Sequence, residues 1–156
     1  MRSCVLMLAP VTENLIPTGE LTNVKGTPFD FLVPEFIGKR INEDNIQLKN
    51  GKGYDHNWVL DKKEGELGLA VVLTDTASGR VLELSTTEPG VQFYSGNFMD
   101  GTSNGKSGKP HAFRTGLAME PQHFPDSPNQ PKFPSVVYKA GDLYKQLSVF
   151  RFSIKK

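Results

Sequence analysis

The sequence predicts an all-β, sandwich-like fold in a single domain that spans residues 1–156. Its apolar residues occur in short runs bounded by turn residues, as expected of strands in a sheet. The chain also contains fifteen glycines and eleven prolines, which disfavour long helices and favour tight turns. No internal repeat, heptad pattern or long linker divides the sequence. We therefore expect one antiparallel sandwich.

Eight short segments carry the strand pattern. They are residues 5–9, 57–61, 67–74, 81–86, 91–97, 113–120, 136–140 and 143–154. Between the third and fourth of these, Gly79 can take the positive φ that a tight turn needs, so the two segments should form a hairpin. The last segment alternates imperfectly, which is typical of a half-buried strand that closes a sheet.

Only residues 36–45 carry a helical pattern. Ile37 and Ile41 lie four residues apart with charged residues between them, which predicts one or two helical turns.

Charge and composition exclude several classes of protein. Eighteen Lys and Arg residues oppose seventeen Asp and Glu residues, and this net charge of +1 is too small for a nucleic-acid or anionic-membrane partner. No stretch approaches the ~18–20 apolar residues of a spanning helix. The single cysteine, Cys4, cannot form an intramolecular disulfide, and the apolar run at 5–9 is too short for a secretory signal. We therefore expect a cytoplasmic protein.

Two possible ligand motifs are set aside. Residues 101–108, GTSNGKSG, place three residues before Gly-Lys-Ser where a phosphate loop has four, and Pro110 disfavours the helix that should follow. This stretch is interpreted as an exposed loop. His56, His111 and His123 are too scattered to form a metal site, so we expect hydrogen-bonded or surface histidines and no metal.

The stretch at residues 53–60, GYDHNWVL, combines an acid, an imidazole, an amide and two aromatic rings. This mixture suits a sugar, because aromatic rings stack on its apolar face while carboxylate and amide groups bind its hydroxyls. The alternative is a capped strand entry in which Asp55 accepts hydrogen bonds from local backbone N–H groups. Composition alone leaves both interpretations open.

Residues 116–135 place Glu120 at the start of a proline-rich loop. The recurring prolines fix φ, so the loop loses little entropy on ordering and can hold Glu120 and Gln122 in place. The alternatives are a rigid surface loop or a proline-rich ligand for a recognition domain. Phe124 and Phe133 favour packing against the body of the protein over an extended, solvated segment.

Three stretches together resemble the aldose 1-epimerase (galactose mutarotase) family. They are PVTENLIPTGELTNVKGTPFDF at 10–31, GYDHNWVL at 53–60, and TTEPGVQFYSGN at 86–97 with GLAMEPQHFPDSPNQPKFPS at 116–135. Their order and spacing are similar to the C-terminal half of the family's chain. Residues 1–9 are atypical, since Val5 and Leu6 stand where the family usually has Ala-Asp.

The resemblance implies a large antiparallel β-sandwich that interconverts the α and β anomers of free hexoses, such as galactose and glucose, without a cofactor. Glu120 is implied to be the base that takes the proton from the C1 hydroxyl, and Asp55 to bind sugar hydroxyls. Gln122, Trp58 and Phe93 are implied as pocket lining. A small-molecule sugar is therefore the expected partner.

One departure from the family pattern bears on activity. The family's ring-oxygen acid is a histidine in an Asn-His-Thr type motif, and a second histidine and an arginine also line its pocket, yet none of these motifs occurs here. We therefore expect a truncated epimerase with impaired activity, and the alternative is a non-catalytic sugar-binding β-sandwich fragment. Truncation through a sheet exposes strand edges and apolar surface, which predicts self-association.

Overall fold

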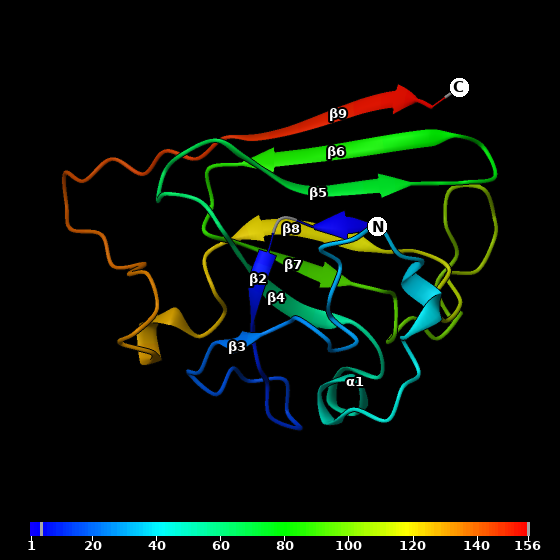
Figure 1. The fold of residues 1–156 in the computed structure, drawn as a ribbon, viewed down its shortest axis with the longest axis horizontal. Helices are drawn as coiled ribbons and strands as arrows, with labels where there is room; N and C mark the ends of the chain where they lie inside the picture. The colour runs from blue at the N-terminus through cyan, green and yellow to red at the C-terminus, as the bar shows by residue number, and fades with distance from the viewer. Residues whose placement is uncertain (4, 156) are drawn as a thin grey trace.

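The computed structural model describes residues 1–3 and 5–155, and the expectation for Cys4 lies outside the described residues. Two antiparallel sheets contain the named strands (Figure 1). The four-stranded sheet has the order β1 (Arg2–Ser3), β5 (Gly68–Thr74), β6 (Arg80–Thr86), β9 (Ser148–Ile154). The five-stranded sheet has the order β3 (Thr22–Asn23), β2 (Val5–Ala9), β4 (Asp55–Leu60), β7 (Gly90–Tyr94), β8 (Ala118–Gln122). This architecture confirms the predicted all-β class.

The β5–β6 hairpin forms as the sequence predicts. The two strands pair antiparallel, and the backbone N–H of Gly79 donates to the carbonyl of Asp75 at 2.8 Å. Gly79 has a φ of 73°, and a Cβ there would lie 2.7 Å from the carbonyl oxygen of Lys155. Glycine is therefore required both by the backbone conformation and by the close approach of the C-terminal end.

The C-terminal strand predictions were partly wrong. Residues 136–140 form no strand, and Val137 is highly exposed there. The strands expected at 113–120 and 143–154 begin later, as β8 and β9. Apolar runs become strands only where a neighbouring strand completes their hydrogen bonds, and residues 136–140 have no such neighbour.

The helical prediction for residues 36–45 was also displaced. A 3-10 turn covers Ile37–Lys39, and a short helix, α1, covers Ile46–Gly51. The Asn45 side chain accepts a hydrogen bond from the backbone N–H of Gln47 at 2.9 Å and so caps α1. The cap fixes the start of α1 at Ile46, directly after the segment that apolar spacing indicated. No helix in the described part of the chain is long and apolar enough to cross a membrane.

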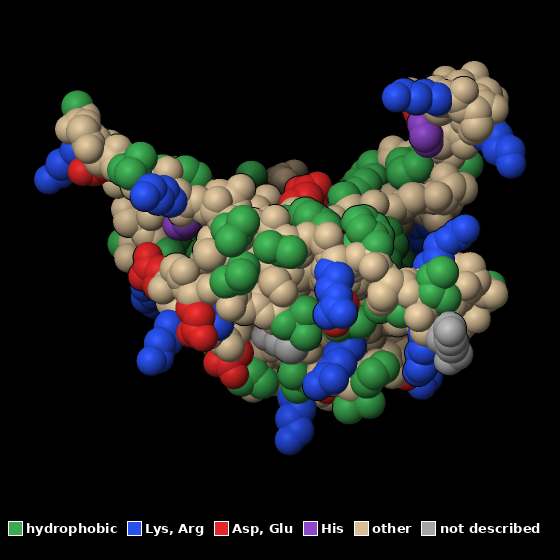
Figure 2. All heavy atoms as spheres, turned by 90° about the horizontal axis from the view of Figure 1, so that it is seen from above, with side chains coloured by type: hydrophobic (Ala, Val, Ile, Leu, Met, Phe, Trp, Pro, Cys, Tyr) green, Lys and Arg blue, Asp and Glu red, His purple; other side chains and the backbone are tan. Residues whose placement is uncertain are grey.

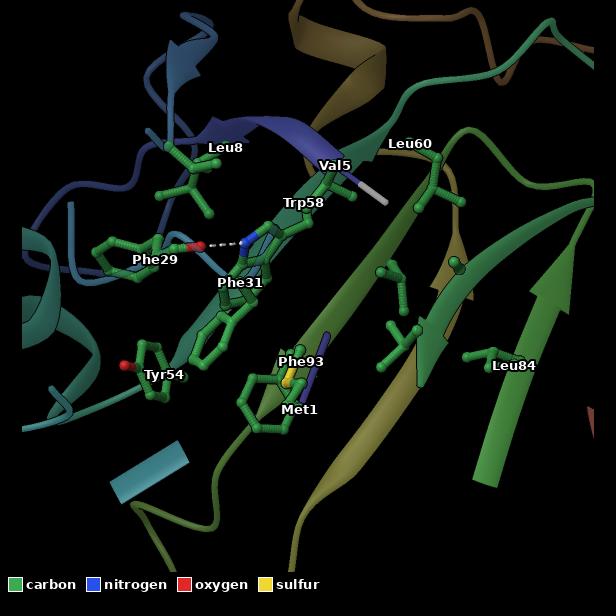
Figure 3. Packing of buried hydrophobic residues seen from close by; sticks show 14 of the residues in the cluster. Met1, Val5, Leu8, Phe29, Phe31, Tyr54, Trp58, Leu60, Leu84 and Phe93 are labelled. Atoms are coloured by element: carbon green, nitrogen blue, oxygen red, sulfur yellow. Dashed lines mark hydrogen bonds between the residues drawn. The ribbon is translucent and has the colours of Figure 1, made fainter. Parts of the chain in front are cut away.

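An aromatic cluster fills the core between the sheets (Figure 3). Trp58, on β4, packs against four other buried rings and donates from Nε1 to the carbonyl of Phe29 at 3.2 Å. The rings around it are those of Phe29, Phe31, Tyr54 and Phe93. The four-stranded sheet contributes Ala70, Val71 and Leu84 to the same core. The aromatic cluster therefore packs against one side of the five-stranded sheet.

The β9 edge of the four-stranded sheet is much less covered. Phe150 pairs with Leu84, a core residue, so it and Phe152 lie on the side of the sheet that faces the core. Phe152 is nevertheless 76% exposed. Figure 2 looks down on this edge and shows hydrophobic side chains gathered on the surface. At β9 the core-facing side of the four-stranded sheet is therefore left largely uncovered.

Candidate functional site

Three strands of the five-stranded sheet bring polar side chains onto the face opposite the core. In the register, Asn57 of β4 pairs with Gln92 of β7, and Gln92 pairs with Glu120 of β8. Asp55 lies two residues before Asn57, so its side chain points to the same face. Each of these strands has hydrophobic residues at the alternate positions, which face the core. The polar face therefore follows from strand alternation.

A carboxylate–amide pair lies at the centre of this face. Nε2 of Gln92 donates to Oδ1 of Asp55 at 2.8 Å. Burial raises the pKa of the half-buried Asp55 carboxyl, and the hydrogen bond from Gln92 opposes that rise. Glu120 is exposed on the neighbouring strand, where a ligand can reach it. A polar ligand on this face would meet the hydrogen-bonded carboxylate of Asp55 and the exposed carboxylate of Glu120.

The hydrogen bonds of Asp55 bear on the strand-cap interpretation of the GYDH stretch. The hydrogen bond to the Asp55 carboxylate comes from Gln92 on another strand. The backbone N–H of Asp55 instead donates to Nδ1 of His56 at 3.1 Å. The carboxylate is thus directed across the sheet to β7, and its hydrogen bond differs from the local cap that the alternative predicts.

The predicted lining residues divide between the two faces. Gln122 follows Glu120 by two positions and shares its face. Trp58 and Phe93 lie on the opposite face, buried at 1% and 0% exposure within the aromatic core. The expectation that these two rings line the pocket is therefore corrected: they pack behind the sheet and support β4 and β7.

Gln92 was missed as a site residue at the level of sequence. It lies in TTEPGVQFYSGN directly before Phe93, and adjacent residues of a strand face opposite sides of the sheet. Assigning Phe93 to the core would have assigned Gln92 to the polar face. What the sequence could not provide is that β7 lies between β4 and β8, because sheet order depends on contacts distant in sequence.

A buried carboxylate fixes the end of β8. Nδ1 of His123 lies 2.8 Å from Oε2 of Glu88, and the hydroxyl of Tyr144 donates to Oε1 of the same carboxylate at 2.5 Å. Three separate segments thus meet just beyond Gln122, beside a groove of about 680 Å³ that Gln122 also lines. The proline-rich loop packs back through Phe124 and Phe133 against Ala9, which agrees with the predicted packing of that loop.

The histidines do not assemble a metal site in the described residues, where no group of three His, Cys, Asp or Glu side chains has suitable geometry. His56 is buried, His123 pairs with Glu88, and His111 is exposed in the 101–112 loop.

Burial of His56 predicts a loss of stability in acid. Desolvation lowers the pKa of His56 to about 4, from 6.5 in the ordinary state. Between pH 6.5 and pH 4, His56 is protonated in the unfolded chain but remains neutral in the folded chain. The free energy of unfolding therefore falls as the pH drops toward 4. The expected loss is roughly 3 kcal/mol over that window.

Urea unfolding at pH 7 and pH 4.5 measures this loss of stability. His56→Gln should reduce this slope, whereas the exposed-site control His111→Gln should keep it; equal slopes in wild type and His56→Gln would contradict the prediction.

Comparisons with known proteins identify the family of this chain. A family model described as aldose 1-epimerase matches residues 2–151. A galactose mutarotase from Bos taurus is 46% identical over 145 residues, which cover 93% of this chain and 41% of that protein. An aldose 1-epimerase from Escherichia coli (strain K12) is 37% identical over 145 residues, covering 92% of this chain and 41% of that protein.

A solved structure shows the same fold. The crystal structure of a GalM/aldose epimerase homologue from C. elegans superposes with a TM-score of 0.82 at 27% identity, over 99% of this chain and 45% of that one. The molecule is thus a β-sandwich protein of the epimerase type. The chain belongs to the aldose 1-epimerase family, a family of isomerases. It spans less than half the length of these relatives.

Proposed function

We propose that the chain binds free hexoses such as galactose and glucose and supplies the base for interconversion of their α and β anomers. The observation that carries this proposal is the alignment of Asp55, Gln92 and Glu120 on one face of three adjacent strands. Asp55 and Gln92 present acceptors and donors in fixed directions, as sugar hydroxyls require. The single cysteine among 156 residues is compatible with a cytoplasmic site for this reaction.

The chemistry assigned to Glu120 is proton transfer at C1. The carboxylate accepts the proton of the C1 hydroxyl while an acid protonates the ring oxygen, so that the C1–O5 bond breaks and C1 becomes an aldehyde carbon. Rotation about C1–C2 then presents the other face of the aldehyde. The C5 hydroxyl attacks it and returns its proton to the acid, and Glu120 returns a proton to the new C1 hydroxyl. No net proton or electron is gained.

The ring-oxygen acid is the missing component. In the described part of the chain, none of the three histidines lies on the face of Asp55 and Glu120: His56 is on the core face, His123 is held by Glu88, and His111 lies in a distant loop. We therefore propose that this chain alone turns over slowly, since one general acid or base typically supplies ~10²–10⁴-fold in rate. The same observation favours the second candidate function, sugar binding without catalysis.

Polarimetry separates these two candidates. Freshly dissolved α-D-galactose or α-D-glucose is followed with and without the chain, beside a Glu120→Gln variant, and sugar binding is measured by chemical-shift titration. Acceleration that the variant lacks supports epimerase activity. Binding without acceleration supports the non-catalytic alternative. A folded chain that neither binds nor accelerates contradicts the proposal.

We also propose that two copies associate through the β9 edge. Among the described residues β9 ends the four-stranded sheet, so its outer backbone groups can pair with another strand. Phe152→Lys places a charge on this exposed apolar edge and should shift sedimentation velocity toward the monomer. The matched control is Val33→Lys, which changes a residue of similar exposure (74%) outside β9. Equal association of both variants and the wild type would argue against the β9 interface.

A further inference from the structure

Three buried polar atoms on the candidate face have no hydrogen-bond partner among residues 1–3 and 5–155. They are Nδ2 and Oδ1 of Asn57 and Oε1 of Gln92. Asn57 is only 2% exposed, and leaving such a group unpaired costs ~1–3 kcal/mol. The two residues are direct partners in the β4–β7 register. The unpaired atoms of Asn57 and Gln92 therefore lie on neighbouring strands, and Gln92 is in turn the register partner of Glu120.

The surroundings of Asn57 leave room for its amide but hold it in place. On one side its register partner is Ala9, which has a small side chain. On the other side, a Cβ at Gly90 would lie 2.4 Å from Oδ1 of Asn57 and 3.0 Å from the ring of Phe124. The absent side chain at Gly90 thus makes the space that the amide occupies. The reaction proposed above does not use Asn57.

The orientation of Gln92 is the property that Asn57 can control. A glutamine amide can direct either its NH₂ or its oxygen toward a neighbour. Here Nε2 donates to Asp55, which leaves Oε1 as an acceptor in need of a donor. If the amide turned over, Oε1 would face the Asp55 carboxylate, and two acceptors would oppose each other.

We propose that Asn57 is a positioning residue: with Oε1 of Gln92 it holds a hydroxyl group, from water or from a sugar, and thereby keeps Gln92 donating to Asp55. The donors run in one direction. Nδ2 of Asn57 donates to the hydroxyl oxygen, the hydroxyl donates to Oε1 of Gln92, and Nε2 of Gln92 donates to Asp55. The sugar arm of this proposal rests on the proposed function, whereas the water arm does not.

The first measurement is the pKa of the Asp55 carboxyl, followed by ¹³C NMR without sugar. Asn57→Leu removes the donor and should raise this pKa by about half a unit to one unit, because the bond that favours the ionised carboxylate weakens. Gln92→Leu should raise it at least as much. In the double variant the Asn57 change should add nothing, since its effect passes through Gln92.

Controls make the outcome specific to positioning. Ser3→Ala removes another buried hydroxyl that lacks a partner among the described residues, but in β1 of the other sheet, and should leave the Asp55 pKa unchanged. Asn57→Ser retains a donor and should keep most of the wild-type pKa. Asn57→Ala removes the donor without adding bulk and takes the place of Asn57→Leu if that variant does not fold. A pKa that stays unchanged in the folded Asn57→Leu variant, both without sugar and with saturating galactose, overturns the proposal. So does a shift that persists in the Gln92→Leu background.

Galactose titration tells the two sources of the hydroxyl apart. If the sugar supplies it, Asn57→Leu should weaken galactose binding several-fold, and galactose should lower the Asp55 pKa in the wild type only. If water supplies it, the pKa effects appear without sugar and galactose adds nothing to them. Failure of every variant, including wild type, to bind galactose would refute the proposed function. The sugar-free pKa comparison would still decide the role of Asn57.

Discussion

Replacing Glu120 with glutamine is expected to lower the chain's acceleration of anomer interconversion by ~10²–10⁴-fold, or to the spontaneous rate if the starting acceleration is smaller. Glutamine has nearly the same shape but cannot accept the C1 proton at neutral pH. Because Glu120 is exposed on β8 and belongs to neither core cluster of the described residues, the fold should be unaffected. Polarimetry with freshly dissolved α-D-galactose measures the change.

The comparison needs a carboxylate that lies outside the site. Glu66→Gln alters an exposed acid in the β4–β5 connection and should retain the wild-type rate. Sugar binding by Glu120→Gln should fall much less than its rate, since Asp55 and Gln92 remain in place. A Glu120→Gln variant as fast as wild type would remove Glu120 from the role of base and direct attention to Asp55.

The strand pattern predicted the fold class well because alternation is a local property. The hairpin at β5–β6 and the buried strand β4 follow from residues that are neighbours in the sequence. Residues 136–140 show where this reasoning ends. Their apolar character is as strong as that of β7, but a strand needs a second strand beside it, and neighbours far along the chain decide whether one exists.

The candidate site was predictable only in part. Resemblance to a family identified Asp55 and Glu120, and the structure places both on one face. The resemblance also implied Trp58 as pocket lining, without regard to side-chain direction. Trp58 is three positions from Asp55, so strand alternation alone places it on the opposite face. The pairing of Gln92 with Asp55 required the order of the strands, which no local pattern contains.

Replacing Trp58 with alanine is expected to lower the free energy of unfolding by ~3–5 kcal/mol, a large share of the ~5–15 kcal/mol that stabilises a typical domain. The ring is 1% exposed, and its centroid lies 5.7 Å from that of Phe29 and 5.8 Å from that of Phe93. Its removal leaves a cavity in the aromatic core and leaves the Phe29 carbonyl without its donor. Urea unfolding monitored by far-UV circular dichroism measures the loss.

Trp58→Phe separates the two causes. Phenylalanine keeps most of the apolar contact but cannot donate to Phe29, so its cost should be nearer the ~1 kcal/mol of one hydrogen bond plus a small cavity. Trp58 also lies next to Asn57 on β4, with its side chain on the other face of the strand. A ring that only supports the sheet should change stability in Trp58→Phe and leave sugar affinity nearly constant. If Trp58→Phe lowered the free energy of sugar binding more than the free energy of unfolding, Trp58 would have to be counted among the sugar-binding residues.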